Sequence, residues 1–211
     1  MKKLTILLFS LSIILTIHTR AQEAFDKGKT VVTIGYGVPN LARVGLRFIY
    51  GGYAGYSVSG FGPILVKGDY GVLKNLGVGA VIGYSSTKLS FDQTDSYYDY
   101  NSGYSQTYTY RESLTWTSLS LGAHANYHFV RKEKVDVYVG GGLGYTINNI
   151  TYTNNDPYNQ NPGSYVAYNP NAVFYAVTIG MRYYFTQNIG IYAEGGIEKG
   201  ALLQGGLALK F

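Results

Sequence analysis

Two histidines lie at a spacing that could bind a metal ion. His124 and His128 are four residues apart in "HANYH", and on a helix residues four apart share one face. The surrounding sequence alternates in character at every second residue, however, and on a strand rising about 3.3 Å per residue the two side chains lie roughly 13 Å apart. We therefore expect no shared metal ion, and we interpret both histidines as satisfied polar residues on the inward face of a strand.

A glycine-rich run and a group of aspartates are the other candidates for chemistry. "VGGGLGYT" at residues 139–146 has the glycine content of a phosphate-binding loop, but it lacks the lysine and the following helix that such a loop requires. Its glycines at 140, 142 and 144 share one strand face, where they make room for bulky neighbours such as Tyr138. Asp92, Asp95 and Asp99 could hold calcium or bridge lipopolysaccharide through divalent cations, although their spacing matches no defined calcium loop. The sequence thus predicts neither a cofactor nor a metal site.

Charged residues on alternating segments form a larger group of candidates. In "NAVFYAVTIGMRYYF" at residues 171–185, every second residue from Val173 to Phe185 is large and apolar, whereas Arg182 shares the other face with small and aromatic residues. Alternation over this length predicts a β-strand with one apolar and one polar face. The ionisable groups therefore belong to the polar face of such strands.

Eight segments show this alternation, and none shows a sustained helical period. The predicted strands lie near residues 29–38, 58–72, 76–90, 108–130, 134–151, 171–185, 188–198 and 201–211. Tight turns are expected at 73–75, 131–133 and 186–188. They alternate with long polar connections at 39–57, 91–107 and 152–170, followed by a short one at 198–200. Up-and-down membrane barrels show this alternation, because short turns lie on one rim and long loops on the other.

These features predict an all-β chain folded as a single up-and-down antiparallel transmembrane β-barrel of eight strands, with short periplasmic turns and long extracellular loops. A soluble eight-stranded barrel needs an apolar interior, whereas here the charges share their face with glycines. A closed barrel leaves no unpaired strand edge in lipid, and strands of about 9–11 tilted residues span the hydrocarbon. Residues 41–50, "LARVGLRFIY", fit either a short amphipathic helix or an extra strand, and an additional hairpin would make ten strands.

The N-terminal sequence predicts export. Two lysines precede an apolar run at residues 4–17, and Ala21 is a small residue behind which signal peptidase can cut. The run is shorter than the roughly 20 apolar residues of a membrane-spanning helix. We therefore expect residues 1–21 to be a cleaved signal peptide and residues 22–211 to form the barrel domain.

Composition excludes two further classes of protein. Without Lys2, Lys3 and Arg20, the 17 basic residues fall to 14 against 12 acidic ones, so the formal charge falls from +5 to +2. This small charge implies no nucleic-acid partner. The chain contains no cysteine, which excludes a disulfide framework and the lipidated cysteine of a lipoprotein.

The polar strand faces would point six charges into the barrel. This lumen charge network consists of Lys67, Asp69, Asp136, Arg182, Glu194 and Lys210. An unpaired charge in a narrow lumen is costly, so we expect the three cations and three anions to pair with one another. Two interpretations of the network stay open. It cross-links the strands, since side chains fill the interior of an eight-stranded barrel, or it lines a narrow ion path.

The C-terminal "QGGLALKF" resembles the assembly signal of outer-membrane barrels. The residues that carry this resemblance are Gln204, Gly206, Leu209 and Phe211. The mature chain is similar to the small OmpX/OmpA-like outer-membrane β-barrels, and "GPILVKGDYGVLKNLGVGAVIGYS" resembles the second and third strands of porin-like barrels of Bacteroidetes type. The resemblance implies a bacterial outer-membrane location, contact with its lipid and lipopolysaccharide, and the barrel-assembly machinery as a folding partner. We expect Phe211 on the lipid face at the periplasmic rim, because the last strand must pair with the first to close the barrel.

The same resemblance bears on catalysis. Some barrels of this size modify lipids, among them a palmitoyltransferase and a lipid A deacylase, and they use histidine with serine or acidic partners at the outer rim or the lipid face. No long connection here contains a histidine. We therefore do not expect an enzyme.

Tyrosine dominates the long connections. The expected loop surface consists of Tyr97, Tyr98, Tyr100, Tyr104, Tyr108 and Tyr110, and the third long connection adds Tyr152, Tyr158, Tyr165 and Tyr168. Tyrosine among serine, asparagine and glycine is typical of adaptable binding surfaces. Alternatively, the fourth and fifth strands extend beyond the membrane and the tyrosines form an interfacial girdle and cross-strand pairs. The leading hypothesis is a structural or surface-interaction role with an extracellular ligand; a narrow porin or ion channel is the alternative, and a lipid-modifying enzyme comes third.

Overall fold

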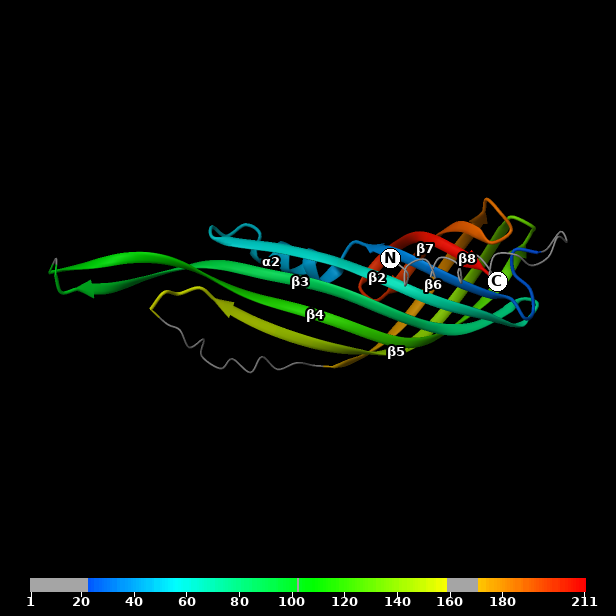
Figure 1. The fold of residues 1–211 in the computed structure, drawn as a ribbon, viewed down its shortest axis with the longest axis horizontal. Coiled ribbons are helices and arrows are strands. Elements are labelled where there is room, and N and C mark those ends of the chain that lie inside the picture. Colours follow the sequence, from blue (N-terminus) through cyan, green and yellow to red (C-terminus); the bar gives the residue numbers. More distant parts are fainter. Residues whose placement is uncertain (1–22, 102, 159–170) are drawn as a thin grey trace, which may run out of the picture.

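Eight antiparallel strands form one closed ring (Figure 1). The computed structural model describes residues 23–101, 103–158 and 171–211. The strands are β1 (Thr30–Val38), β2 (Tyr56–Leu73), β3 (Leu76–Asp99), β4 (Tyr104–Arg131), β5 (Val135–Asn154), β6 (Ala172–Tyr184), β7 (Ile189–Glu198) and β8 (Ala201–Lys210). Each strand pairs with its neighbours in sequence, and β1 also pairs with β8. The eight-stranded up-and-down barrel is thus confirmed; the predicted signal peptide, residues 1–21, lies outside the described residues.

The two ends of the barrel differ. Short turns join β2 to β3, β4 to β5 and β6 to β7 at one end, which we call the turn end. At the opposite end, which we call the hairpin end, β3 and β4 run far beyond the other strands (Figure 1). The connection that holds α2 (Leu41–Tyr50) and the turn from β7 to β8 also lie there. The predicted alternation of connections is therefore present, although most of the connection predicted at residues 91–107 consists of strands.

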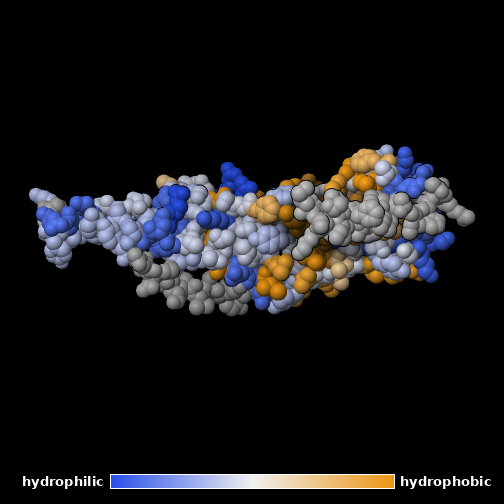
Figure 2. Space-filling model, viewed as in Figure 1, coloured by the Kyte–Doolittle hydropathy of each residue, from blue (hydrophilic) through white to orange (hydrophobic). Residues whose placement is uncertain are grey.

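The outer face of the ring is apolar and the inner face is polar. Along β6 the outward residues Val173, Val177 and Ile179 are 74%, 66% and 56% exposed, whereas Arg182 on the inward face is 1% exposed. Figure 2 shows the apolar surface over the ring, while the projecting parts of β3 and β4 are hydrophilic. An apolar outer band with a polar interior is the arrangement that a transmembrane barrel requires.

Residues 41–50 form a helix, and no additional hairpin is present among the described residues, so the ring has eight strands rather than ten. The Asn40 side chain caps the helix by accepting a hydrogen bond from Arg43 N at 3.0 Å, as N-cap residues do. Its Nδ2 also donates to the carbonyl oxygens of Phe61 and Ser86, which fixes the start of the helix to β2 and β3. No helix in the described ranges is long and apolar enough to cross a membrane.

The prediction that residues 91–107 form a loop is wrong. β3 and β4 stay paired from the ring out to Asp99 and Tyr104, so most of this stretch is a two-stranded extension. Its residues are polar on both faces, and the alternation that identifies a half-buried strand is therefore missing. The threonines and tyrosines of this stretch have the high β propensity that a solvent-exposed strand retains. The alternative of extended strands is correct for the fourth strand, but it paired that strand with the fifth, whereas the structure extends β3 and β4 together.

Gly206 lies at the seam where β8 closes on β1. It pairs with Gly35, and a Cβ at Gly206 would collide with the backbone carbonyl of Ile34. We expect Gly206→Ala to lower the free energy of unfolding by about 1–3 kcal/mol, because the two strands must separate. Urea unfolding of the purified barrel, followed by gel mobility, measures this loss. Gly68→Ala is the control, since a Cβ there meets nothing within 4 Å; equal stability of the two variants would contradict the prediction.

Candidate functional site

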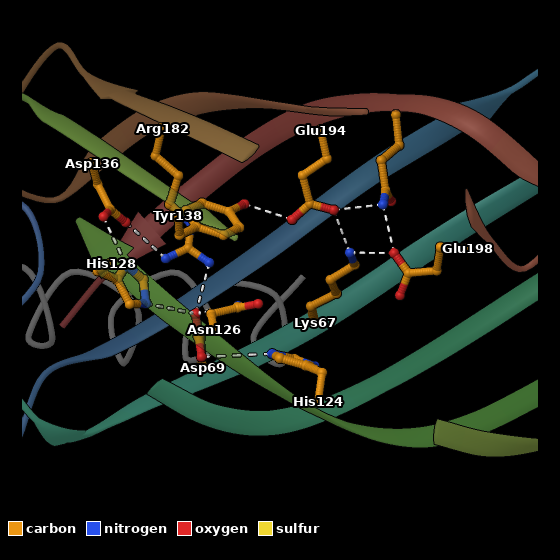
Figure 3. Close-up of polar contacts among 11 residues, drawn as sticks. Lys67, Asp69, His124, Asn126, His128, Asp136, Tyr138, Arg182, Glu194 and Glu198 are labelled. Carbon is orange, nitrogen blue, oxygen red and sulfur yellow. Dashed lines mark hydrogen bonds and ion pairs between the residues drawn. The ribbon is translucent and has the colours of Figure 1, made fainter. Parts of the chain in front are cut away.

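The inward-facing charges gather in two adjoining clusters inside the ring (Figure 3). All six residues of the lumen charge network point inward and are at most 6% exposed. Five of them contact an oppositely charged group, whereas Lys210 contacts none within the part of the chain that the structure describes. Each cluster joins strands that lie on different sides of the barrel, so both span the interior.

The first cluster centres on Arg182 of β6. Its Nη2 donates to Asp69 Oδ2 of β2 at 2.8 Å, and its Nη1 donates to Asp136 Oδ2 of β5 at 3.1 Å. Asn126 donates to the same oxygen of Asp69 at 2.9 Å, and His128 Nδ1 hydrogen-bonds Asp136 Oδ1 at 2.7 Å. We call these five residues the arginine cluster. One guanidinium thus bridges two fully buried carboxylates, because its planar fork of donors can bond a different carboxylate with each Nη.

Both histidines approach the same carboxylate. His124 Nε2 lies 3.6 Å from Asp69 Oδ1, and His128 Nε2 lies 3.7 Å from Asp69 Oδ2. Neither nitrogen has a hydrogen-bond partner, and His124 Nδ1 also has none. Both histidines therefore lie on the inward face as predicted: His128 is hydrogen-bonded to Asp136, and His124 faces Asp69 at ion-pair distance. Within the described residues, no group of three or more His, Cys, Asp or Glu is arranged to hold a metal ion.

The second cluster centres on Lys67 of β2. Its Nζ lies 2.5 Å from Glu194 Oε2 and 2.5 Å from Glu198 Oε2, and Gln204 Nε2 donates to the same two oxygens. We call these four residues the lysine cluster. Tyr138 joins the clusters, because its hydroxyl donates to Glu194 Oε1 at 2.5 Å and the Arg182 guanidinium lies 4.3 Å from its ring centroid.

Lys210 does not form the ion pair with a carboxylate that was expected of it. Its Nζ lies 4.7 Å from the Tyr184 ring centroid and donates to the backbone oxygen of Glu23 at 3.3 Å. The expected pairing of all three cations with carboxylates is therefore wrong for Lys210. The reason is its position near the turn end, where the segment before β1 supplies a carbonyl group and Tyr184 supplies an aromatic face.

That same segment closes the turn end of the interior. Ala24 and Phe25 are fully buried, and the Phe25 ring stacks on His128 with centroids 3.5 Å apart. Ala24 N donates to Lys132 O in the turn between β4 and β5, so the segment is tied to the rim. The barrel is therefore filled from the turn end by this segment, then by the arginine cluster and the lysine cluster.

Glu198 and Phe25 were not predicted as residues of the interior. Glu198 shares the even-numbered inward parity of Tyr192 and Glu194 on β7, so the period of two would have found it. It is 3% exposed, although the register of β7 against β8 shifts between Gly195 and Glu198. No comparable signal marks Phe25, because an aromatic residue before the first strand has no periodic context.

The glycines of β5 make room for neighbours other than the one expected. A Cβ at Gly140 would meet the Asn126 side chain, and a Cβ at Gly144 would meet the Phe174 ring. Tyr138 instead occupies the space beside Gly180 of β6. These contacts explain the inward glycines as space for large side chains in a narrow interior.

The residues of the C-terminal pattern divide between the two faces. Gln204 lies inside and completes the lysine cluster, whereas Gly206 lies at the seam with β1. Phe211 is 45% exposed, and its backbone bonds to Thr30 in both directions. Leu209 pairs with Val32 on β1. Each of these residues therefore has a structural contact in the closed ring, whatever its role in assembly.

Tyrosines pack on the projecting hairpin. Tyr97, Tyr108 and Tyr158 form a contact group with ring centroids 4.7–6.1 Å apart. Tyr98, Tyr100 and Tyr104 are 55%, 89% and 75% exposed. Desolvation, with the hydrogen bond that the Tyr108 hydroxyl donates to Asp156, raises the pKa of Tyr108 to about 12. Tyr165 and Tyr168 lie outside the described residues.

The aspartates of the hairpin do not converge on a cation site. Asp92 pairs with Arg111 across the two strands, with Arg111 Nε 2.6 Å from Oδ1 and Nη2 3.0 Å from Oδ2. The Arg111 guanidinium lowers the pKa of Asp92 through these hydrogen bonds. Asp95 and Asp99 accept backbone hydrogen bonds from their own strand and turn. Their positions are those of cross-strand pairs and turn contacts.

Comparisons with solved structures find small outer-membrane barrels at low sequence identity. OprG from Pseudomonas aeruginosa is 10% identical with a TM-score of 0.47, covering 89% of this chain and 97% of that one. Ail, the attachment invasion locus protein of Yersinia pestis, is 14% identical with a TM-score of 0.37, covering 88% and 99%. The N-terminal β-barrel domain of Pseudomonas aeruginosa OprF is 16% identical with a TM-score of 0.37, covering 88% and 99%.

Comparison of the sequence with family models shows the family of the chain. No curated protein matches the chain. A family model described as "outer membrane protein beta-barrel domain" matches residues 7–199, which is most of the sequence. The closed ring of eight strands and the apolar outer band described above are the features that such a domain requires. This chain belongs to the outer membrane protein beta-barrel domain family.

Proposed function

We propose that the protein presents the hairpin of β3 and β4 outside the cell as a surface for a protein partner. The observation that carries this proposal is the length of the hairpin. β2 stops pairing with β3 at Phe91, and β5 stops pairing with β4 at Glu112. Beyond these residues β3 and β4 continue as a two-stranded ribbon to Asp99 and Tyr104, with no third strand on either edge among the described residues. We call residues 92–111 the ribbon.

The ribbon has the properties of a binding surface. An isolated pair of strands is only marginally stable in water, and its unpaired edges are sites where another extended segment can add a strand. The exposed tyrosines provide large contact area at low entropic cost. The ribbon carries three carboxylates and one arginine, so the complementary partner is a basic, extended protein segment.

The remaining assignments follow from the family. The apolar outer band would contact outer-membrane lipid and lipopolysaccharide, and the hairpin end would face outward. Export would use residues 1–21 as a cleaved signal peptide, and folding would involve the barrel-assembly machinery through Gln204, Gly206, Leu209 and Phe211. The first interpretation of the lumen charge network, as structural cross-links, fits the buried ion pairs and the plug formed by Phe25 better than an ion path does.

Shortening the ribbon tests the proposal. Thr94 and Thr109 are paired across the hairpin, so residues 95–108 can be replaced by Asn-Gly, which forms a two-residue turn. We expect the shortened barrel to fold but to lose at least tenfold in affinity for immobilised basic matrix proteins. Binding is measured with the barrel in lipid nanodiscs, and folding is measured by gel mobility before and after boiling.

A charge variant serves as the matched control for ribbon length. Asp95→Lys with Asp99→Lys keeps the strands but reverses the local charge, so it should weaken binding to basic proteins and not to acidic ones. Undiminished binding by the shortened barrel would remove the support for a role of the ribbon. Equal binding of the charge variant to basic proteins would show that the partner is not recognised by charge.

A further inference from the structure

A cavity of about 470 Å³ lies at the hairpin end, between α2 and the inward faces of β3, β4 and β5. The helix contributes an apolar wall, and the strands contribute Thr87, Trp116, Ser118 and Asn148. The volume is within the range of small-molecule sites, and a mostly apolar lining with a few polar groups is typical of them. This cavity lies apart from the arginine and lysine clusters and from the ribbon.

The helix is held in place although its apolar side is not packed. Asn40 anchors the helix to β2 and β3, and Leu41 N donates to Gly200 O in the turn between β7 and β8 at 2.9 Å. No residue of α2 is buried, and Ile49, which lines the cavity, is 57% exposed. An amphipathic helix normally buries its apolar face. Here the anchors hold that face over an open cavity.

The inward residues below the cavity are polar and end in a cation. Ser118 donates to Asn148 at 2.6 Å, and one inward position deeper Ser120 hydrogen-bonds Thr146 at 3.0 Å. Lys199 enters the barrel from the turn between β7 and β8, donates to Thr146 Oγ1 at 2.5 Å and lies 4.1 Å from the Phe174 ring centroid. No carboxylate of the described residues forms an ion pair with it. Its ammonium group therefore has no direct ion pair, and the carboxylate next to it in the sequence, Glu198, is paired with Lys67.

We propose that this cavity binds a small amphiphile with a carboxylate head and an aliphatic body. The head would lie on Ser118 and Asn148 at the floor of the cavity, above the Lys199 ammonium, which lies one inward position deeper at Thr146 and would attract the carboxylate. The aliphatic body would contact Leu46, Ile49 and Trp116. Each further methylene buried against this wall strengthens binding about fourfold, until the cavity is full.

Trp116 makes the proposal testable, because it is the only tryptophan of the chain and it lines the cavity. Decanoate carrying bromine at its terminal carbon is titrated into the barrel in lipid nanodiscs, since bromine quenches indole fluorescence on contact. We expect saturable quenching. The corresponding bromodecanol, which lacks the negative charge, should bind at least tenfold more weakly, and Lys199→Met should remove this difference.

Two glycines provide a matched pair of variants. A Cβ at Gly45 or at Gly52 would meet nothing within 4 Å, but only Gly45 lines the cavity. Gly45→Phe should therefore fill the cavity and abolish the quenching by bromodecanoate, whereas Gly52→Phe should leave it unchanged. Both variants are first shown to fold by gel mobility.

Four results would overturn the proposal. Quenching that never saturates would indicate collision in solution, and equal quenching by brominated lipid in the nanodisc would show that Trp116 is reached from the membrane. Equal affinity for the alcohol and the carboxylate would exclude charge recognition. The absence of quenching would mean that the cavity does not bind the amphiphile.

Discussion

Replacing Arg182 with methionine is expected to lower the free energy of unfolding by about 3–5 kcal/mol, the cost of breaking a buried ion pair by removing one partner. Arg182 is the guanidinium that holds both Asp69 and Asp136, and all three side chains are at most 1% exposed. Methionine fills similar space but leaves two carboxylates without their cation. Urea unfolding of the refolded barrel, followed by tryptophan fluorescence and gel mobility, measures the change.

An exposed arginine provides the control for this variant. Arg111 also pairs with an aspartate in a bidentate geometry, but its side chain is 56% exposed. Arg111→Met should change the free energy of unfolding by less than about 1 kcal/mol, because exposed ion pairs contribute little. If the two variants unfold at the same urea concentration, the arginine cluster is not the cross-link that its burial indicates.

Replacing Lys67 with methionine should have an effect of similar size, about 3–5 kcal/mol. Lys67 Nζ is the only cation between Glu194 Oε2 and Glu198 Oε2 among the described contacts of the lysine cluster. Without it the two carboxylates face each other across a narrow interior, and Gln204 can offer only neutral donors. The same urea unfolding experiment measures the loss.

A second substitution separates charge from packing in this cluster. Glu198→Gln in the Lys67→Met background removes one of the two opposing charges and should recover a large part of the lost stability. Lys88→Met is the surface control, because Lys88 lies on β3 with its side chain exposed. A double variant as unstable as Lys67→Met alone would show that the cost arises from lost packing and not from unpaired charge.

The strand faces could be predicted from the sequence, but the partners inside the ring could not. A period of two assigns Lys67 and Glu194 to inward faces, because successive side chains point to opposite sides of a sheet. Their meeting depends on the height of each residue along the barrel axis, which is set by the stagger of all eight strands. β2 and β7 are not adjacent in the ring, so no local pattern relates these two residues.

The pairing of β3 with β4 in the ribbon and the burial of Phe25 could not be assigned from the sequence, for different reasons. Tyr97 and Tyr108 lie on strands that face water on both sides, so no apolar face reveals the strand and the polar composition indicates a loop. Phe25 is buried because it enters the turn end of the barrel and stacks on the inward-facing His128. His128 lies more than a hundred positions later in the sequence, so the residues that neighbour Phe25 in the sequence do not predict its burial.

The pairing of β1 with β8 determines when the barrel can close during folding. Val31 pairs with Lys210, so the ring closes only when the last strand has been synthesised and delivered. Until then the other seven strands would present two unpaired edges, which are prone to aggregation. Such long-range pairing also slows folding, since the loop entropy is lost before the contacts form. The chain must therefore be kept unfolded during transit, and its closure is a single late event.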